Sequence, residues 1–371
     1  MKNMDQQAFF ELLRAGLWEK EANLQQSGNV NFHTIMQFAE EQTVIGIITS
    51  GLEHVNDVTV SKNDLLQFIG ASLQIEQNNT AMNSFIADLV GKMRKAGIYT
   101  LLVKGQGVAQ CYERPLLRAC GDIDLFLSEE NYKKAKAFLT PLAINVEKES
   151  VYGKHLGMTI DNWVVELHGK LCVSLSRRIN KTLSIIQDDI VFNGNVRSWM
   201  NGGTQVFLPG VDNDVIYIFT HYLNHFYKGG IGLRQICDWC RLLWTYKNTI
   251  NTELLKKRLL QMGLVSEWKA FGAFAVDYLG MPADAMPFYS PKRKWTRKAN
   301  RIRDFIIDVG NFGHNRNMGY YSRYPYVIRK GFSFVRICVD LFRHARILPL
   351  DSFRFFPNIM FYGLRSAVRG E

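Results

Sequence analysis

The sequence has few cysteines, few prolines and no long hydrophobic run. Six cysteines in 371 residues are too few for a disulfide scaffold, so we expect reduced thiols in a cytosolic protein. Nine prolines and 29 glycines exclude a collagen-like or low-complexity chain. No apolar run approaches the roughly 20 residues of a membrane span. Asp5 and Glu11 interrupt the N-terminal stretch, which therefore does not read as a signal peptide. A soluble or peripheral protein is expected.

The chain contains enough apolar residues for a large core. Hydrophobic residues make up 47% of it, aromatic residues 12% and charged residues 21%, which excludes wholesale disorder. At roughly 100–200 residues per domain, two or three structural units are expected.

Positive charge is concentrated near the C-terminus. The net charge is +11, yet residues 287–371 hold 17 Lys and Arg against 5 Asp and Glu, a net of +12. The rest of the chain holds 28 against 29 and is nearly neutral. A basic tail therefore follows a neutral body.

Hydrophobic periodicity predicts helices on both sides of a mixed α/β unit. Ser61 with Asp64 resembles a capping box, and Asp212 is a plausible N-cap of a later helix. We expect an α+β protein in four parts: a helical N-terminal region (1–96), an α/β core with a mixed sheet (97–210), a helical substrate-side domain (211–286) and a basic, aromatic-rich helical tail (287–371).

The segment 101–127 carries the chemistry. Asp122 and Asp124 lie two apart on a predicted strand, so their side chains share one face. Two neighbouring carboxylates repel each other unless a cation lies between them, and Mg²⁺ suits such oxygen ligands. The alternative is the solvent-facing side of an edge strand.

The surrounding residues favour the metal interpretation. Lys104 and Gly105 end one strand and open a helix, where backbone N–H groups can approach a phosphate. Glu166 supplies a third acid on the predicted strand 163–168. The elements therefore follow a characteristic order along the chain: a strand, a glycine turn, a helix, the Asp-x-Asp strand and a later strand with one acid.

These segments resemble the nucleotidyltransferase superfamily that includes DNA polymerase β and small bacterial antitoxin-type enzymes. They resemble more closely a family of largely uncharacterised bacterial nucleotidyltransferases. That family shows a Leu-x-x-Lys-Gly turn, an Arg-x-x-(small)-Asp-Ile-Asp-Leu strand and a Glu-Leu-His strand, found here at 101–105, 118–125 and 166–168. The resemblance covers roughly residues 1–280. Gln106 follows Gly105 where the superfamily usually has serine or glycine.

The resemblance implies a polymerase-β-like core and a Mg²⁺-dependent transfer of a nucleoside monophosphate from an NTP such as ATP. Asp122, Asp124 and Glu166 would hold two Mg²⁺ ions, and Glu166 could also accept the acceptor's proton. Lys104, Gly105 and Arg118 would contact the phosphates. For Arg118 the alternatives are a surface arginine and a structural pair with an acid.

Three further residues are candidate substrate-binding groups. His168 would face the same side as Glu166, where it could contact the substrate or orient the acid that binds the metal. A purely structural histidine is the alternative. Arg234 and Asp238 are four apart on one helix face, where they could form an ion pair or contact the acceptor.

A zinc site is a competing interpretation of a nearby pattern. The pairs His221-x3-His225 and Cys237-x2-Cys240 each have zinc-like spacing. Because the cysteines share a face with apolar residues, we favour two core thiols.

The basic tail has three interpretations. It could cover the catalytic core, which we favour, lie on an anionic membrane surface, or bind nucleic acid through basic residues around Trp295. Two rivals to the enzyme therefore remain: a catalytically silent binding or regulatory module of the same fold, and a peripheral membrane or nucleic-acid-binding protein that acts through its tail.

Overall fold

A computed structural model describes residues 3–150, 152–311 and 324–369. Seven strands form one sheet in the order β3-β4-β5-β2-β1-β7-β6. β2 pairs in parallel with β5, and β1 with β7, while the other neighbours are antiparallel. The strands are β1 (Leu101–Val103), β2 (Asp122–Phe126), β3 (Asn145–Val146), β4 (His155–Ile160), β5 (Trp163–His168), β6 (Val196–Asn201) and β7 (Thr204–Pro209).

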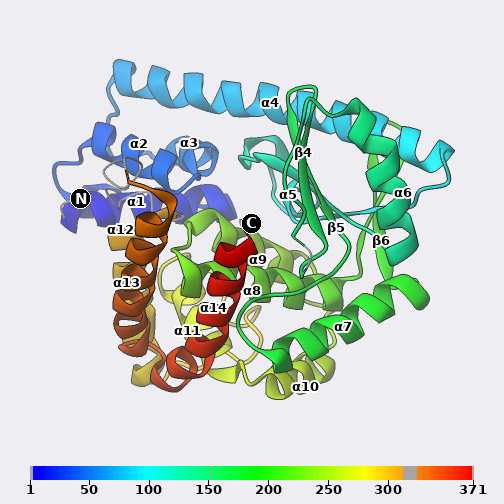
Figure 1. Cartoon of the computed structure of the whole chain (residues 1–371). Helices are drawn as coiled ribbons and strands as arrows, with labels where there is room; N and C mark the ends of the chain where they lie inside the picture. Colours follow the sequence, from blue (N-terminus) through cyan, green and yellow to red (C-terminus); the bar gives the residue numbers. More distant parts are fainter. Residues whose placement is uncertain (1–2, 151, 312–323, 370–371) are drawn as a thin grey trace.

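Helices surround this sheet and account for most of the chain (Figure 1). The predicted α+β class, with a mixed sheet and helical flanks, is confirmed. The helices are α1 (Asn3–Trp18), α2 (Phe32–Glu41), α3 (Ile45–Leu52), α4 (Lys62–Lys95), α5 (Gly105–Ala109), α6 (Glu129–Leu139), α7 (Arg177–Phe192), α8 (Val211–Lys228), α9 (Leu233–Thr245), α10 (Thr252–Met262), α11 (Val265–Asp277), α12 (Arg293–Val309), α13 (Tyr326–Ala345) and α14 (Pro349–Arg369).

Two apolar clusters hold these elements together. The larger joins helices from the beginning, middle and end of the chain, with Phe9, Phe219 and Phe355 among its fully buried members. The smaller lies at the sheet, where Met82 and Leu89 of α4 pack with strand residues. The long helix α4 thus runs from the helical part onto the sheet, along the top of Figure 1.

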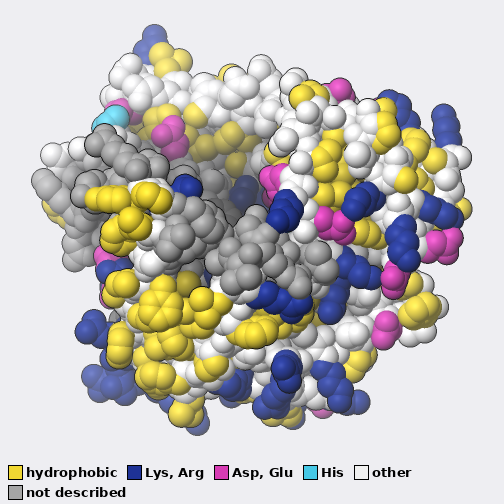
Figure 2. Space-filling view, in the orientation of Figure 1, with side chains coloured by type: hydrophobic (Ala, Val, Ile, Leu, Met, Phe, Trp, Pro, Cys, Tyr) yellow, Lys and Arg dark blue, Asp and Glu magenta, His cyan; other side chains and the backbone are white. Residues whose placement is uncertain are grey.

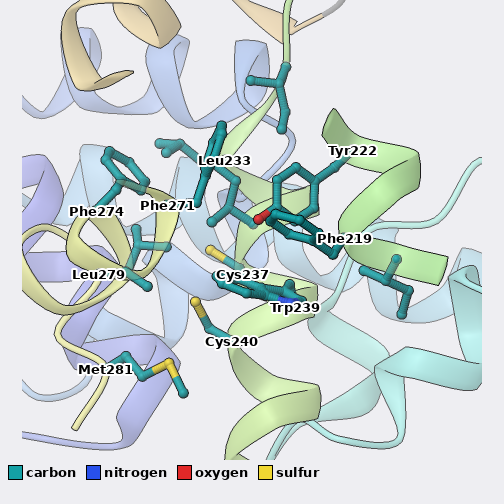
Figure 3. Packing of buried hydrophobic residues seen from close by; sticks show 14 of the residues in the cluster. Phe219, Tyr222, Leu233, Cys237, Trp239, Cys240, Phe271, Phe274, Leu279 and Met281 are labelled. Carbon is teal, nitrogen blue, oxygen red and sulfur yellow. The ribbon is translucent and has the colours of Figure 1, made fainter. Parts of the chain in front are cut away.

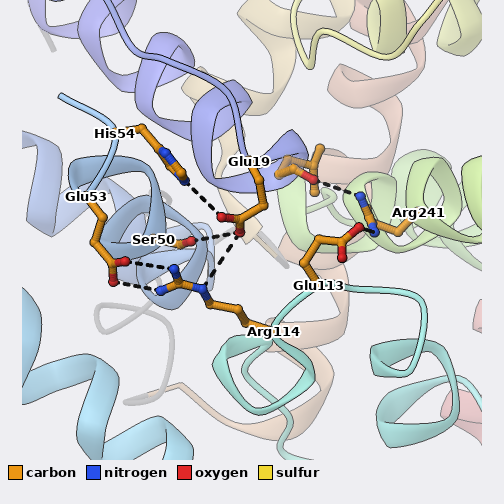
Figure 4. A network of polar contacts seen from close by, with 8 residues as sticks. Glu19, Ser50, Glu53, His54, Glu113, Arg114 and Arg241 are labelled. Atoms are coloured by element: carbon orange, nitrogen blue, oxygen red, sulfur yellow. Dashed lines mark hydrogen bonds and ion pairs between the residues drawn. The ribbon is translucent and has the colours of Figure 1, made fainter. Parts of the chain in front are cut away.

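A polar network fixes the loop before β2 to the N-terminal helices (Figure 4). Arg114 donates two hydrogen bonds of 2.7 Å to Glu53 and lies 3.8 Å from Glu19. Arg241 of α9 donates to the backbone oxygens of Cys111 and Leu17 at 2.8 and 3.0 Å. The segment that leads into Asp122 is therefore anchored from two sides.

Several local expectations can be compared with the structure. Ser61 is the N-cap of α4 and accepts the Asp64 N–H at 3.1 Å, as predicted. Asp212 is not an N-cap, because α8 begins at Val211 after Gly210. The Asp212 carboxylate instead accepts the backbone N–H of Asn251 at 2.8 Å.

The basic tail is only partly incorporated into the core. Trp295 and Phe305 of α12 are buried, and α12 packs on α11. Trp295 is only 8% exposed, so it presents no free face for stacking on a nucleic acid base. Part of the aromatic-rich stretch, residues 320–323, lies outside the described residues. Within the described ranges, no helix has the length and apolar character needed to cross a membrane.

Candidate active site

Three carboxylates meet on the adjacent strands β2 and β5. Asp122 and Asp124 are two apart on β2, so their side chains share a face of the sheet. The parallel register pairs Glu166 of β5 with Asp124. One oxygen from each carboxylate lies within 4.8 Å of the others. The structure thus brings the three predicted acids together.

Asp124 is buried and contacts two basic side chains. Lys104 Nζ and His168 Nε2 each lie 2.7 Å from its Oδ1. Burial raises the pKa of Asp124, but the charge of Lys104 and the hydrogen bond from His168 outweigh burial and hold this pKa below its usual range. Burial lowers the pKa of His168, yet the same hydrogen bond raises it overall. Asp124 is therefore ionised, and His168 is biased towards its charged form.

Glu166 forms a hydrogen bond with His155 and a longer ion-pair contact with His168. His155 Nε2 lies 2.9 Å and His168 Nε2 3.5 Å from its Oε2. Burial raises the pKa of Glu166, but hydrogen bonds from His155 and then His168 outweigh burial and hold it well below its usual range. His155, Glu166 and His168 also form a second group whose ligand atoms could hold a metal ion.

Asp122 differs from the other two acids. Within the described part of the chain, its carboxylate takes part in no hydrogen bond or ion pair. Burial raises its pKa, and the charge of Asp124 raises it further. Such like-charge repulsion is relieved by a bound cation, and oxygen donors are the ligands that Mg²⁺ prefers. The donor set of Asp122, Asp124 and Glu166 therefore fits a divalent cation.

Arg118 forms a buried ion pair with α9. Its Nε and Nη2 donate to the two oxygens of Asp238 at 3.0 and 2.5 Å, and Tyr112 donates to the same carboxylate at 2.8 Å. Of the alternatives for Arg118, its contacts are those of a structural pair with an acid. Of the two alternatives for Arg234 and Asp238, the ion pair is not found among the described residues, because Asp238 binds Arg118 instead.

Arg234 is a cation on the cavity wall without a carboxylate partner among the described residues. Its Nη1 donates to the backbone oxygen of Ala119 at 2.6 Å, while its Nε is buried without a hydrogen bond. Burial lowers its pKa, and the neighbouring charge of Arg118 lowers it further. This side chain is suited to bind an anion.

The turn between β1 and α5 has an unusual backbone. Lys104 has a φ of 59°, a conformation that is uncommon for residues other than glycine and is enriched at functional sites. Gly105 has a φ of 41°, and a Cβ there would lie 3.2 Å from Cys120 Sγ. Gln106 is buried, and its Nε2 donates to Asn79 Oδ1 at 2.7 Å. The residue that departs from the superfamily pattern therefore ties α5 to α4.

A cavity of about 510 Å³ connects these groups. The carboxylates and Lys104 lie on the sheet side, while α8 and α9 supply other lining residues, including Asn224, His221, His225 and Arg234. The two histidine Nε2 atoms are 3.1 Å apart. Burial and the charge of Lys104 lower the pKa of both histidines, that of His225 to about 4. Both are therefore neutral near pH 7.

The zinc-like cysteines lie elsewhere. Cys237 and Cys240 are fully buried among aromatic side chains of α8, α9 and α11 (Figure 3). In the described residues, no group that could hold a metal includes either cysteine. The favoured interpretation of two core thiols is confirmed.

The sequence did not predict that His155 belongs to the site, or that His221 and His225 line the cavity. Asp161 and Asn162 separate two strand-like runs, and a two-residue hairpin there would have placed His155 opposite His168. The spacing of His221 and His225 indicates one helix face, but nothing local indicates what that face contacts.

One comparison with known proteins identifies a sequence family. The sequence model of a family described as "Uncharacterised nucleotidyltransferase" matches residues 28–280, a range that includes every cavity residue named above. Among solved structures, the chain is similar to an antigenic nucleotidyltransferase-like protein from Paracoccidioides brasiliensis. The identity is 13% and the TM-score 0.32, over 54% of this chain and 92% of that one. Curated protein sequences give no match.

Proposed function

Because the chain belongs to this family of uncharacterised nucleotidyltransferases, we propose that it is a Mg²⁺-dependent enzyme that transfers a nucleoside monophosphate from an NTP to a hydroxyl acceptor. The observation that carries this proposal is the cluster of Asp122, Asp124 and Glu166, in which Asp122 has no partner among the described residues. A surface cluster of acids would be solvated, whereas this one lines a cavity of about 510 Å³ together with Lys104 and Arg234.

Asp122, Asp124 and Glu166 are the residues that would hold the metal. Bound there, Mg²⁺ would neutralise charge on the triphosphate and lower the pKa of the acceptor hydroxyl. The hydrogen bond with His155 and the ion-pair contact with His168 lower the basicity of Glu166, so we assign it as a ligand rather than as the proton acceptor.

The cations of the cavity have separate tasks in this proposal. Arg234 would bind phosphate oxygens, because its charge is not offset by a described carboxylate. Lys104 would hold Asp124 ionised and add positive charge next to the phosphates. Arg118 would position the segment before β2 through its pair with Asp238.

The proposed reaction is an in-line displacement. The acceptor oxygen attacks the α-phosphorus and forms the new P–O bond. The bond from the α-phosphorus to the oxygen that bridges to the β-phosphorus breaks, and pyrophosphate leaves with that electron pair. The hydroxyl proton passes to water in the cavity. The acceptor is a small molecule, a sugar or a protein side chain, and we propose the cytoplasm as the compartment.

The test is transfer of label from α-³²P-NTPs. Each of the four nucleotides would be incubated with the protein, Mg²⁺ and cell extract, beside the Asp122→Asn/Asp124→Asn double variant. We expect Mg²⁺-dependent labelling of a product with one nucleotide, and its loss in the double variant. A chain that neither labels a product nor binds any Mg²⁺-NTP in calorimetry would be a non-catalytic module.

A further inference from the structure

Helix α13 exposes an apolar stripe. Ile328, Val335, Val339 and Phe342 recur at spacings of seven, four and three residues, which places them on one helix face. All four are exposed, and Phe342 is 65% exposed. This side of α13 would normally be polar in a helix that faces water.

The neighbouring helix α14 repeats the arrangement. Leu350, Phe353, Phe361 and Leu364 are exposed and recur at spacings of three, eight and three residues, which also places them on one helix face. Leu350 is 83% exposed. The two helices pack against each other. Figure 2 shows hydrophobic side chains gathered over them. We call this surface the hairpin face.

The opposite sides of both helices are already used for packing. His344 of α13 is buried, with its ring 4.7 Å from that of Phe226. Phe355 of α14 is buried, with its ring 5.0 Å from that of Tyr227. The Tyr362 hydroxyl donates to the Tyr152 hydroxyl at 2.6 Å. The hairpin is therefore docked on the body, and its outward side faces away from the core.

Arginines border the hairpin face. Arg329 and Arg343 are exposed and each follows a position of the α13 stripe, whereas Arg336, seven residues from both, is partly buried. Residues 287–371 carry a net charge of +12, and Asp340, one of their few acids, is buried. Apolar residues bordered by arginine form the pattern of a helix that lies in the surface of an anionic membrane.

We propose that the hairpin face binds the surface of a membrane that contains anionic lipid. Charge complementarity favours this occupant over a second copy of the chain, because two such faces would bring rows of arginine together. The apolar stripes would insert into the outer part of the acyl region, and the arginines would lie at the level of the lipid headgroup phosphates. This inference does not depend on the catalytic proposal, since it uses none of the cavity residues.

Vesicle binding tests the inference with the full chain. We would measure cosedimentation with vesicles of phosphatidylcholine alone and with about one-third phosphatidylglycerol. We expect binding to the anionic vesicles, weakened by salt. Arg329→Gln/Arg343→Gln should lower the affinity about 30-fold, because each charge at the surface contributes about a factor of five. Phe342→Ser/Phe361→Ser should lower it at least about tenfold.

A matched control separates the hairpin face from exposed apolar residues in general. Phe192 of α7 and Leu260 of α10 are also exposed and lie outside the hairpin. Phe192→Ser/Leu260→Ser should leave vesicle binding unchanged, and melting temperatures would verify that all variants fold. The proposal is overturned if the intact chain does not bind anionic vesicles. It is also overturned if sedimentation shows a dimer that Phe342→Ser/Phe361→Ser dissociates.

Discussion

At the scale of single residues, Asp122 carries the metal hypothesis because its half-buried carboxylate has no partner in the described chain. Burial and the charge of Asp124 raise its pKa, so ionisation of Asp122 is less favourable in the folded protein than in the unfolded chain. Glu166 and Asp124, in contrast, each accept hydrogen bonds from basic side chains. A binding site that is destabilised without its ligand would have this pattern.

Asp122→Asn should therefore have opposite effects on stability and on metal binding. In EDTA the variant should melt a few degrees higher than the wild type, because it replaces a half-buried carboxylate that Asp124 repels with a neutral amide. With Mn²⁺ as the probe, calorimetry should show at least about tenfold weaker binding. Asp161→Asn, at the exposed β4–β5 turn, should change neither. A lower melting point in EDTA would contradict this account of Asp122.

His225 provides a prediction about pH. Its pKa falls from 6.5 to about 4 on folding, through burial and the charge of Lys104. Between these values the unfolded chain binds a proton that the folded chain does not, so stability should fall as the pH is lowered from 6.5 to 4. His221, Lys228, Asp124 and Glu166 also act on this group.

His225→Asn should remove part of that pH dependence, at most about 3 kcal/mol. Thermal unfolding across this pH range would measure it. His33→Asn, which changes an exposed histidine of α2, should leave the slope as in the wild type. If the pH dependence of stability is unchanged in His225→Asn, the lowered pKa of His225 does not cause it, and this account of His225 is wrong.

At the scale of elements, the pair of Arg118 and Asp238 joins the segment before β2 to α9. Removing one partner leaves a buried charge without compensation. Arg118→Met should lower stability by about 3–5 kcal/mol, whereas Arg118→Met/Asp238→Asn should cost less than the sum of the two single variants. Thermal unfolding of all four proteins completes the cycle. Strictly additive effects would mean that the pair is not coupled.

Helices α1 and α3 cross so closely that side chains are excluded between them. A Cβ on Gly51 would lie 2.0 Å from the backbone oxygen of Leu12. Gly51→Ala should therefore destabilise the protein by about 2–3 kcal/mol. Gly70→Ala, in an open part of α4, should stabilise it by about 0.5–1 kcal/mol. Denaturation midpoints would distinguish these signs, and equal effects would contradict the close crossing.

Local pattern predicted some elements well and others poorly. The strand Trp163–His168 was predicted with its observed bounds, because its apolar, β-prone run is short and sharply bounded. The tail was predicted to be helical, but the bounds of α14 were not, because Pro357 lies inside this helix and several apolar residues at helical spacing are exposed. The sequence could not predict that α8 forms a wall of the cavity. That position depends on how the helix packs against distant parts of the chain, and no local sequence pattern records it.

At the scale of the whole molecule, the site lies where the sheet meets the helical body. The sheet contributes the carboxylates, and α8 and α9 contribute histidines and Arg234. The three acids and Lys104 could be anticipated from the sequence, because strand alternation and a glycine turn act over a few residues. The pairing of Arg118 with Asp238, 120 positions away, could not.

The measurement that tests the central claim most directly is the fate of two labels in one reaction. With the nucleotide found to react, α-³²P and γ-³²P forms would be supplied in parallel to the wild type and to Asp122→Asn. Nucleotidyl transfer predicts α label in the product, γ label in pyrophosphate, and neither with the variant. Transfer of the γ label, with the α label left in a nucleoside diphosphate, would contradict the account and indicate a kinase.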